Sequence, residues 1–134
     1  MTESKILDDR TYTKSHEWWK TEGDRITLGI TDHAQSELTD IVFVDLPKVG
    51  AEVHAGQSML VLESVKTVAD VYAPTDGSIV EVNTALREHP EFINQDPYGK
   101  GWIVRIRPHG APPAPDRSLP PEAYRELIAA GGSH

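Results

Sequence analysis

The residue with the clearest chemical potential in this chain is Lys66, which lies in the polar segment Glu63-Ser64-Val65-Lys66-Thr67. Of the six lysines, only Lys66 has strand-like apolar sequence on both sides. The flanking runs are rich in Val, Leu, Ala and Tyr, and β-branched and aromatic residues favour the pleated surface of strands. The four residues 63–66 between the runs leave room only for a tight turn. We therefore predict a hairpin that exposes the Lys66 amine at its tip.

Ser64 and Lys66 could alternatively form a hydrolytic Ser–Lys pair. That chemistry needs a desolvated lysine with a lowered pKa and a group that stabilises an oxyanion. A hairpin tip exposes both side chains, and the sequence lacks the Gly-x-Ser-x-Gly pattern. We therefore expect a protein without catalytic activity of its own, with a small hydrolase as the alternative.

The other chemically competent side chains form no recognisable motif. The six histidines lack His-x-x-x-His spacing, and the chain has no cysteine. The sequence therefore predicts no metal site, no disulfide and no cysteine nucleophile. His33 has no nucleophile or acidic partner tied to it in sequence, so we interpret it as a histidine on a helix surface.

Turns that contain glycine precede and follow the lysine hairpin. They lie in residues 49–57 and 74–82, and each leads into alternating apolar positions. Glycine allows such turns to adopt positive φ without steric cost. The order of turn, strand, lysine tip, strand, turn and strand predicts a small barrel that displays one lysine.

These features resemble the biotinyl/lipoyl carrier superfamily. Within it, Glu63 to Thr67 and the segment Asp70-Val71-Tyr72-Ala73-Pro74 are similar to the glycine cleavage H-protein family. Biotin carriers usually have Met-Lys-Met at the tip and acyltransferase lipoyl domains Asp-Lys-Ala, whereas this chain has Val-Lys-Thr. Residues 30–35 and 92–102 also match H-protein motifs.

The resemblance implies a mainly β protein with short helices. Its fold would be a lipoyl-type flattened β-barrel, or barrel-sandwich hybrid, with a flanking N-terminal hairpin and helix and a C-terminal helix. We expect an N-terminal segment at 1–10, a lipoyl-carrier domain at 11–107 and a proline-rich connector at 108–120. A C-terminal helix at 121–134 would pack on the same domain.

Two local details can be predicted in the N-terminal half. Asp32 followed by Gln35 suggests a capping box with Asp32 as the N-cap residue, which predicts a short helix within residues 31–38. Thr39 stands where the family usually has glycine, in the turn Leu38-Thr39-Asp40. Because positive φ would strain a β-branched residue, we expect a variant turn that avoids it.

The resemblance also implies the function. Lipoic acid would be joined by an amide to Lys66, and the lipoate-attaching enzyme would recognise Glu63 and Ser64. The arm would carry the aminomethyl group of glycine from glycine decarboxylase (P protein) to the aminomethyltransferase (T protein). Dihydrolipoyl dehydrogenase (L protein) would then reoxidise it. A lipoyl or biotinyl carrier of another complex, or a lipoate relay, remains an alternative.

A loaded arm would need protection, since the aminomethyl group is cationic and is lost to water. Acidic and hydroxyl groups stabilise such a cation where water is partly excluded. Asp70 is the nearest candidate in sequence, and Ser15 and Glu17 match the family's N-terminal motif. We expect these three residues to shelter the arm.

Composition limits the partners. Thirteen basic and 21 acidic residues give a net charge of −8, which disfavours nucleic acid and anionic membrane surfaces. The chain has no apolar run long enough to span a membrane. Its acidic start resembles neither a signal peptide nor a transit peptide, so we expect a cytoplasmic protein that meets basic partner surfaces.

Overall fold

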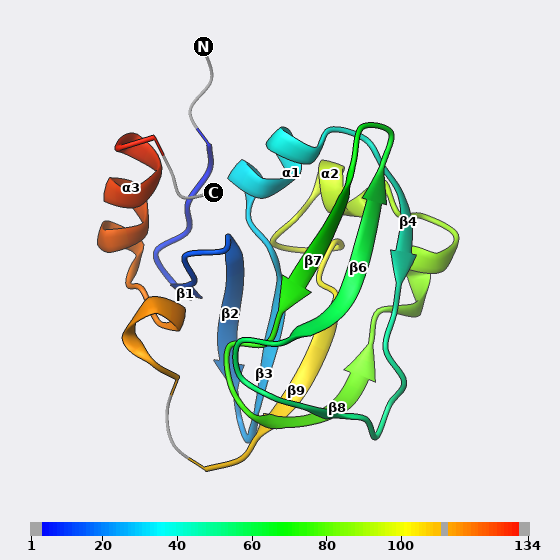
Figure 1. Cartoon of the computed structure of the whole chain (residues 1–134), viewed down its shortest axis with the longest axis vertical. Coiled ribbons are helices and arrows are strands. Elements are labelled where there is room, and N and C mark those ends of the chain that lie inside the picture. Colours follow the sequence, from blue (N-terminus) through cyan, green and yellow to red (C-terminus); the bar gives the residue numbers. More distant parts are fainter. Residues whose placement is uncertain (1–3, 111–112, 132–134) are drawn as a thin grey trace.

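The computed structural model describes residues 4–110 and 113–131, and its described part contains two antiparallel sheets (Figure 1). The larger sheet has the order β1 (Thr11–Tyr12), β2 (Glu17–Glu22), β3 (Arg25–Ile30), β9 (Val104–Pro108), β8 (Gly77–Val82) and β5 (Glu52–Val53). The smaller sheet has the order β4 (Ile41–Asp45), β6 (Ser58–Ser64) and β7 (Val68–Tyr72). The segments predicted at the termini and in the connector include residues 1–3, 111–112 and 132–134, which lie outside the described part.

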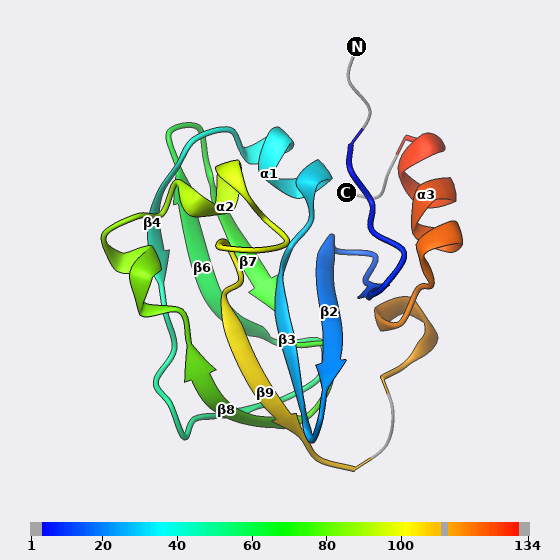
Figure 2. The ribbon, with the colours of Figure 1, turned by 180° about the vertical axis from the view of Figure 1, so that it is seen from behind.

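The two sheets enclose the main apolar core. The smaller sheet faces the viewer in Figure 1, and the larger sheet faces the viewer in Figure 2. Alternate residues of the strands point inward, and the most buried of them include Leu28, Leu62, Val71, Ile79 and Ile106. The period-two burial of β6 explains why the sequence pattern identified this strand. The mainly β, barrel-sandwich fold is confirmed.

The helix α1 (Asp32–Leu38) forms where it was predicted, but its cap differs. Thr31 is the N-cap residue, and its Oγ1 accepts a hydrogen bond of 3.1 Å from the amide of Ala34. The prediction of a cap at Asp32 was therefore wrong by one residue. The Asp32 carboxylate instead accepts hydrogen bonds from Gln35 Nε2 at 2.9 Å and from the Lys5 amide at 2.8 Å.

The turn after α1 does not avoid positive φ, so the expectation of a variant turn was wrong. Thr39 has φ 62° and ψ −150°, a conformation that is essentially restricted to glycine. The Asn94 side chain holds this turn in place, because its Nδ2 donates a hydrogen bond to Thr39 O at 2.8 Å. Its Oδ1 accepts from the Ile41 amide at 2.9 Å. These tertiary hydrogen bonds hold Thr39 in a backbone conformation that the local sequence disfavours.

Short helices follow the lysine hairpin. The 3-10 helix η1 (Thr84–Arg87) and the helix α2 (Phe92–Gln95) lie in the segment after β8. Asn83 is the N-cap residue of η1, but its side chain does not cap that helix. Its Nδ2 donates instead to the carbonyls of Lys100 at 2.8 Å and Trp102 at 2.7 Å, which anchors the loop that precedes β9.

The C-terminal part docks on a second, aromatic cluster. After the 3-10 helix η2 (Pro115–Arg117), the helix α3 (Pro121–Ala129) buries Tyr124 completely. The Tyr124 ring stacks on Tyr12, with ring centroids 4.6 Å apart. Tyr124, with Leu127 and Ile128 packed against the same cluster, therefore docks α3 on the body of the protein.

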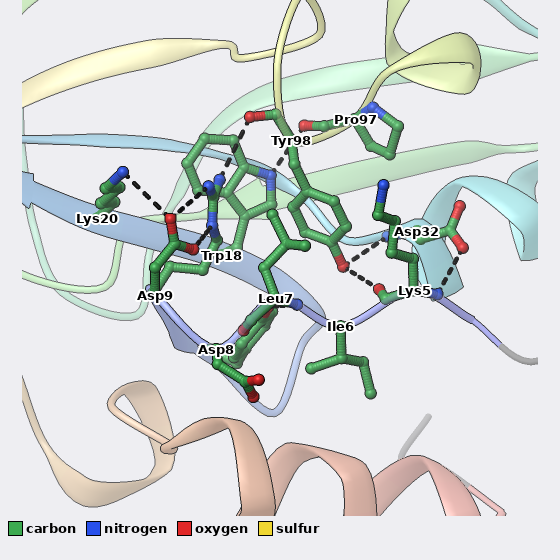
Figure 3. A network of polar contacts seen from close by, with 12 residues as sticks. Lys5, Ile6, Leu7, Asp8, Asp9, Trp18, Lys20, Asp32, Pro97 and Tyr98 are labelled. Atoms are coloured by element: carbon green, nitrogen blue, oxygen red, sulfur yellow. Dashed lines mark hydrogen bonds and ion pairs between the residues drawn. The ribbon is translucent and has the colours of Figure 1, made fainter.

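The N-terminal segment lies between α3 and the larger sheet, as Figure 3 shows at close range. Tyr98 Oη donates to Lys5 O at 2.5 Å and accepts from the Asp32 amide at 3.2 Å. Tyr12 Oη donates to Leu7 O at 2.8 Å. The Tyr98 hydroxyl thus ties this segment to the start of α1, and the Tyr12 hydroxyl ties it to β1. Among the described residues, no helix has the length and apolar character needed to cross a membrane.

Candidate functional site

Lys66 is exposed at the tip of the β6–β7 hairpin, as predicted. The turn lies slightly later than expected, because β6 continues through Ser64 and Glu63 pairs with Val68. Ser64 closes the turn: its amide donates to Thr67 O at 2.8 Å. Its Oγ accepts from the amides of Lys66 at 3.1 Å and Thr67 at 3.0 Å. The local sequence therefore makes the backbone that carries Lys66 well defined.

The helix α1 and the turn after it support the tip from one side. Lys66 Nζ donates to the carbonyl of Glu37 at 3.1 Å, and Val65 N donates to Asp40 O at 3.0 Å. Glu37 lies in the last turn of α1, where helix carbonyls lack partners and the helix end attracts cations. The strained turn at Thr39 therefore lies beside the lysine and places the Asp40 carbonyl against the hairpin.

The geometry does not support a Ser–Lys pair. Ser64 Oγ is engaged by backbone groups of the turn, and Lys66 Nζ is held by Glu37 O. Both contacts lie at an exposed tip. A lysine that acts as a general base needs to reach the serine hydroxyl in a desolvated site, which this arrangement does not provide. In the described ranges, no group of three or more potential ligands is arranged to hold a metal ion.

A pocket of about 190 Å³ lies beside the hairpin. Its walls come from the hairpin, from α1, from the end of β3 and from the loop before β2. Figure 1 shows α1 and the tip of the hairpin at the same end of the molecule. The apolar part of the lining comprises Ile30, Ala34, Leu38, Leu62, Ala69 and Val71. The polar part comprises Ser15, His16, His33, Glu37 and Asp70. The structure thus brings the predicted residues Ser15 and Asp70 to one pocket, next to the helix end that holds Lys66.

Glu17 lies deeper than the other predicted residues. It is only 1% exposed, and its carboxylate accepts hydrogen bonds from Thr13 Oγ1, from Ser15 Oγ at 2.6 Å and from the Tyr72 amide at 3.1 Å. Burial raises the pKa of Glu17, although these hydrogen bonds oppose the shift. Glu17 lines a neighbouring cavity of about 540 Å³, which shares Ser15 and His16 with the first pocket. Glu17 and Asp70 therefore do not line the same pocket.

Asp70 lies on the exposed surface of β7. Its Oδ1 accepts a hydrogen bond of 2.8 Å from Ser58 Oγ, across the β6–β7 pair. Glu63 is also exposed, one residue before the Ser64 that closes the tip. The carboxylates close to Lys66 in sequence thus remain accessible to solvent, whereas Glu17 does not.

Sequence reasoning missed the role of His16 and His33 in shaping the pocket. The His16 and His33 ring centroids are 4.8 Å apart, and His33, which lies on the surface of α1 as predicted, is half-buried and lines the pocket. His16 has φ 71°, and its Nδ1 lies 2.8 Å from Tyr124 Oη on α3. The only local signal for His16 was its place between Ser15 and Glu17.

Comparison with known proteins connects this geometry to a family. The family model described as "Glycine cleavage H-protein" matches residues 10–129. The chain is 51% identical over 124 residues to the glycine cleavage system H protein of Rubrobacter xylanophilus, covering 92% of this chain and 96% of that protein. It is 52% identical over 123 residues to the Thermus thermophilus H protein, covering 92% and 95%.

The structural comparison agrees. A crystal structure of a glycine cleavage system H protein from Mycobacterium marinum superposes with a TM-score of 0.85 at 42% identity. The match covers 92% of this chain and 99% of that one. Family, sequence relatives and fold therefore coincide over nearly the whole length, and the chain belongs to the glycine cleavage H-protein family.

Proposed function

We propose that this protein is the lipoyl carrier of a glycine cleavage system and that lipoic acid is attached through an amide to Lys66 Nζ. The observation that carries the proposal is an exposed amine on a well-defined hairpin tip, next to a pocket with apolar walls. Acylation replaces the ammonium by a neutral amide: Nζ gives up two protons in all and bonds to the carboxyl carbon of an activated lipoyl donor, and the activating group of the donor leaves. A bound lipoyl group supplies a disulfide that can accept the aminomethyl group of glycine.

The residues beside Lys66 fit such a group. The apolar walls from α1 and β6 suit an alkyl chain, since apolar surface is stabilised when it leaves water. We propose that Ser64 and Glu63 help the attaching enzyme to recognise the tip, Ser64 by fixing the turn and Glu63 through its exposed charge. Ser15 and Asp70 would shelter the far end of the arm, and Glu17 would hold the Ser15 hydroxyl in place.

The proposed partners are the P, T and L proteins of the glycine cleavage system and a lipoate-attaching enzyme. The T protein is the aminomethyltransferase, and the P and L proteins are the decarboxylase and the dihydrolipoyl dehydrogenase. Family membership supports this assignment at the level of the whole system. The carrier supplies position and protection, while its partners supply the catalysis.

Intact mass spectrometry tests the attachment site. Lys66→Arg should keep the fold but show no lipoyl mass increment and no support of glycine cleavage, because arginine keeps the charge without an amine that forms the amide. Lys48→Arg, at another exposed lysine, should be lipoylated like the unaltered protein. An increment that persists in Lys66→Arg would exclude Lys66. A biotin increment, or support of a 2-oxoacid dehydrogenase alone, would favour the alternative carriers.

A further inference from the structure

The outward side of the smaller sheet carries an unusual combination of side chains. We define the outer face as Phe43, Asp45, Val61, Glu63 and Val68, which come from all three strands of this sheet. In one row Phe43 pairs with Glu63 and Glu63 pairs with Val68. In the next row Asp45 pairs with Val61. Apolar and acidic residues are therefore interleaved on this face.

The apolar residues of this face are exposed to a degree that packing within the chain does not explain. Phe43 is 50% exposed and Val68 is 63% exposed, and Val65 at the adjoining tip is 67% exposed. The sequences of β4, β6 and β7 contain no basic residue. Exposed apolar side chains that cluster in this way, bordered by charges of one sign, are typical of protein interaction sites.

We infer that the outer face is the docking surface for the enzyme that acylates Lys66, and that this enzyme meets it with apolar side chains bordered by lysine or arginine. The inference rests on the proposed attachment at Lys66. It goes beyond that proposal because it assigns recognition to a sheet surface, whereas the proposal names only the lysine and its neighbours in the turn.

Reach and access favour this partner. The Lys66 amine is separated from its backbone by only four methylene groups, so an enzyme that acylates it must press against the tip and the surface next to it. An enzyme that acts on the end of an attached arm can work from a greater distance. On the side of α1, the tip is already in contact with the carbonyls of Glu37 and Asp40. The outer face is the open approach.

Charge favours the same partner surface. Asp45 and Glu63 are both exposed, and no cation on these strands neutralises them. Opposite charges across the interface accelerate encounter, and the apolar contacts then hold the complex. A second acidic copy of this chain would instead place carboxylates against carboxylates, which disfavours self-association through this face.

The apolar part of the interface can be tested with Phe43→Thr combined with Val68→Thr, changes that remove apolar surface but place a β-branched residue, which favours strands, at both positions. With a lipoate–protein ligase, ATP and lipoate, we expect KM to rise at least about tenfold, the size typical of lost interface anchors, with kcat unchanged. Surface plasmon resonance without lipoate should show a matching rise in Kd. Val49→Thr is the matched control, because Val49 is 61% exposed beyond the end of β4 remote from the tip.

The acidic part can be tested with Asp45→Lys against Glu126→Lys on α3. Each change takes the net charge from −8 to −6, since one negative charge becomes positive (−8 + 2 = −6). Only Asp45→Lys should raise KM and weaken the dependence of the association rate on salt. Equal effects of the two variants would show that overall charge alone steers the enzyme.

The outcomes separate this inference from the proposed function. If Lys66 is not the acceptor, the unaltered protein shows no increment that Lys66→Arg abolishes, and both proposals fail. If Lys66 is acylated but KM and Kd are the same in the Phe43→Thr, Val68→Thr protein, only the docking inference is overturned. A dimer in sedimentation that these substitutions dissolve, with acylation kinetics unchanged, would also overturn it by assigning the face to self-association.

Discussion

At the scale of single residues, the least expected feature of the site is the buried carboxylate of Glu17. An exposed carboxylate contributes little to the free energy of folding, whereas a buried carboxylate has to be paired with a charge or hydrogen-bonded. Glu17 accepts hydrogen bonds from Thr13, Ser15 and the Tyr72 amide, which ties the loop before β2 to the end of β7. Under the proposed function, we therefore expect Glu17 to position Ser15.

The raised pKa of Glu17 predicts a pH dependence of stability. Because the folded state holds the Glu17 proton more tightly than the unfolded state, the contribution of Glu17 is fully present below the ordinary carboxyl pKa. It is lost as pH rises from that value through the raised folded pKa. Relative to Glu17→Gln, the free energy of unfolding of the unaltered protein should fall across this window by up to about 1.4 kcal/mol per pH unit.

Urea denaturation at a series of pH values measures this difference. The matched control is Glu63→Gln, which makes the same change at an exposed carboxylate. Parallel stability curves for Glu17→Gln and the unaltered protein would contradict the expected shift.

Asp70 supplies the prediction on sheltering. The double variant Glu17→Gln, Asp70→Asn should be lipoylated like the unaltered protein. Once loaded with the aminomethyl group, it should release formaldehyde faster, because the carboxylate that stabilises this cationic group is gone. Formaldehyde can be trapped and measured over time. The control is Asp45→Asn, another exposed strand carboxylate, which should leave the decay unchanged. Unchanged decay in the double variant would make Asp70 and Glu17 ordinary carboxylates with respect to the arm.

At the scale of elements, the hairpin depends on the turn between α1 and β4. Asn94 on α2 fixes Thr39 and Ile41, and Asp40 in the same turn accepts the hydrogen bond from Val65. The lysine tip is therefore braced by a segment whose own backbone is strained at Thr39. We interpret the strain as the cost of placing the Asp40 carbonyl against the hairpin.

Glycine at position 39 should relieve this strain. A non-glycine residue in such a conformation costs about 1–3 kcal/mol, while the extra chain entropy of glycine offsets about 0.5–1 kcal/mol of the gain. Thr39→Gly should therefore raise the free energy of unfolding by up to about 2 kcal/mol. Thr39→Ala keeps the Cβ and should give no such gain. Thermal and urea denaturation measure both, and equal stabilities of the two variants would exclude backbone strain at Thr39.

At the scale of the whole molecule, the lysine tip and the C-terminal helix lie on opposite sides. Figures 1 and 2 both place α3 across the molecule from the β6–β7 hairpin. Tyr124 on α3 stacks on Tyr12, and the Tyr124 hydroxyl oxygen lies 2.7 Å from Thr31 Oγ1. The helix thus covers the aromatic cluster while leaving the lysine tip accessible.

Removal of residues 118–134 should therefore lower the melting temperature without preventing lipoylation. The deletion exposes Tyr12 and removes the paired bonds between Tyr12 and Leu119, at 2.9 and 2.7 Å. A milder variant, Tyr124→Phe, loses only the hydroxyl contacts and should cost about 1–3 kcal/mol. Calorimetry and intact mass measure the two effects. Complete loss of modification in a truncated protein that is still folded would give the tail a part in recognition.

The sequence by itself determined the strands, the lysine tip and the family. Alternation in β6 and the polar segment around Lys66 are local patterns, so they can be read without knowing the partners of each strand. The motifs around Lys66 and at residues 30–35 and 92–102 also identify the family from the sequence alone. The helix α1 could be placed for the same reason, although Thr31 rather than Asp32 caps it.

Only the tertiary structure decided which residues meet around the lysine. Ser15 and Asp70 line the same pocket, and His16 contacts Tyr124, which lies 108 positions further along the chain. Thr39 adopts positive φ because Asn94, distant in sequence, holds it there. Contacts of this kind depend on how strands pair across long separations, as between β3 and β9, and no short-range pattern encodes that pairing. Local periodicity defines the elements, and the free energy of packing them together defines the site.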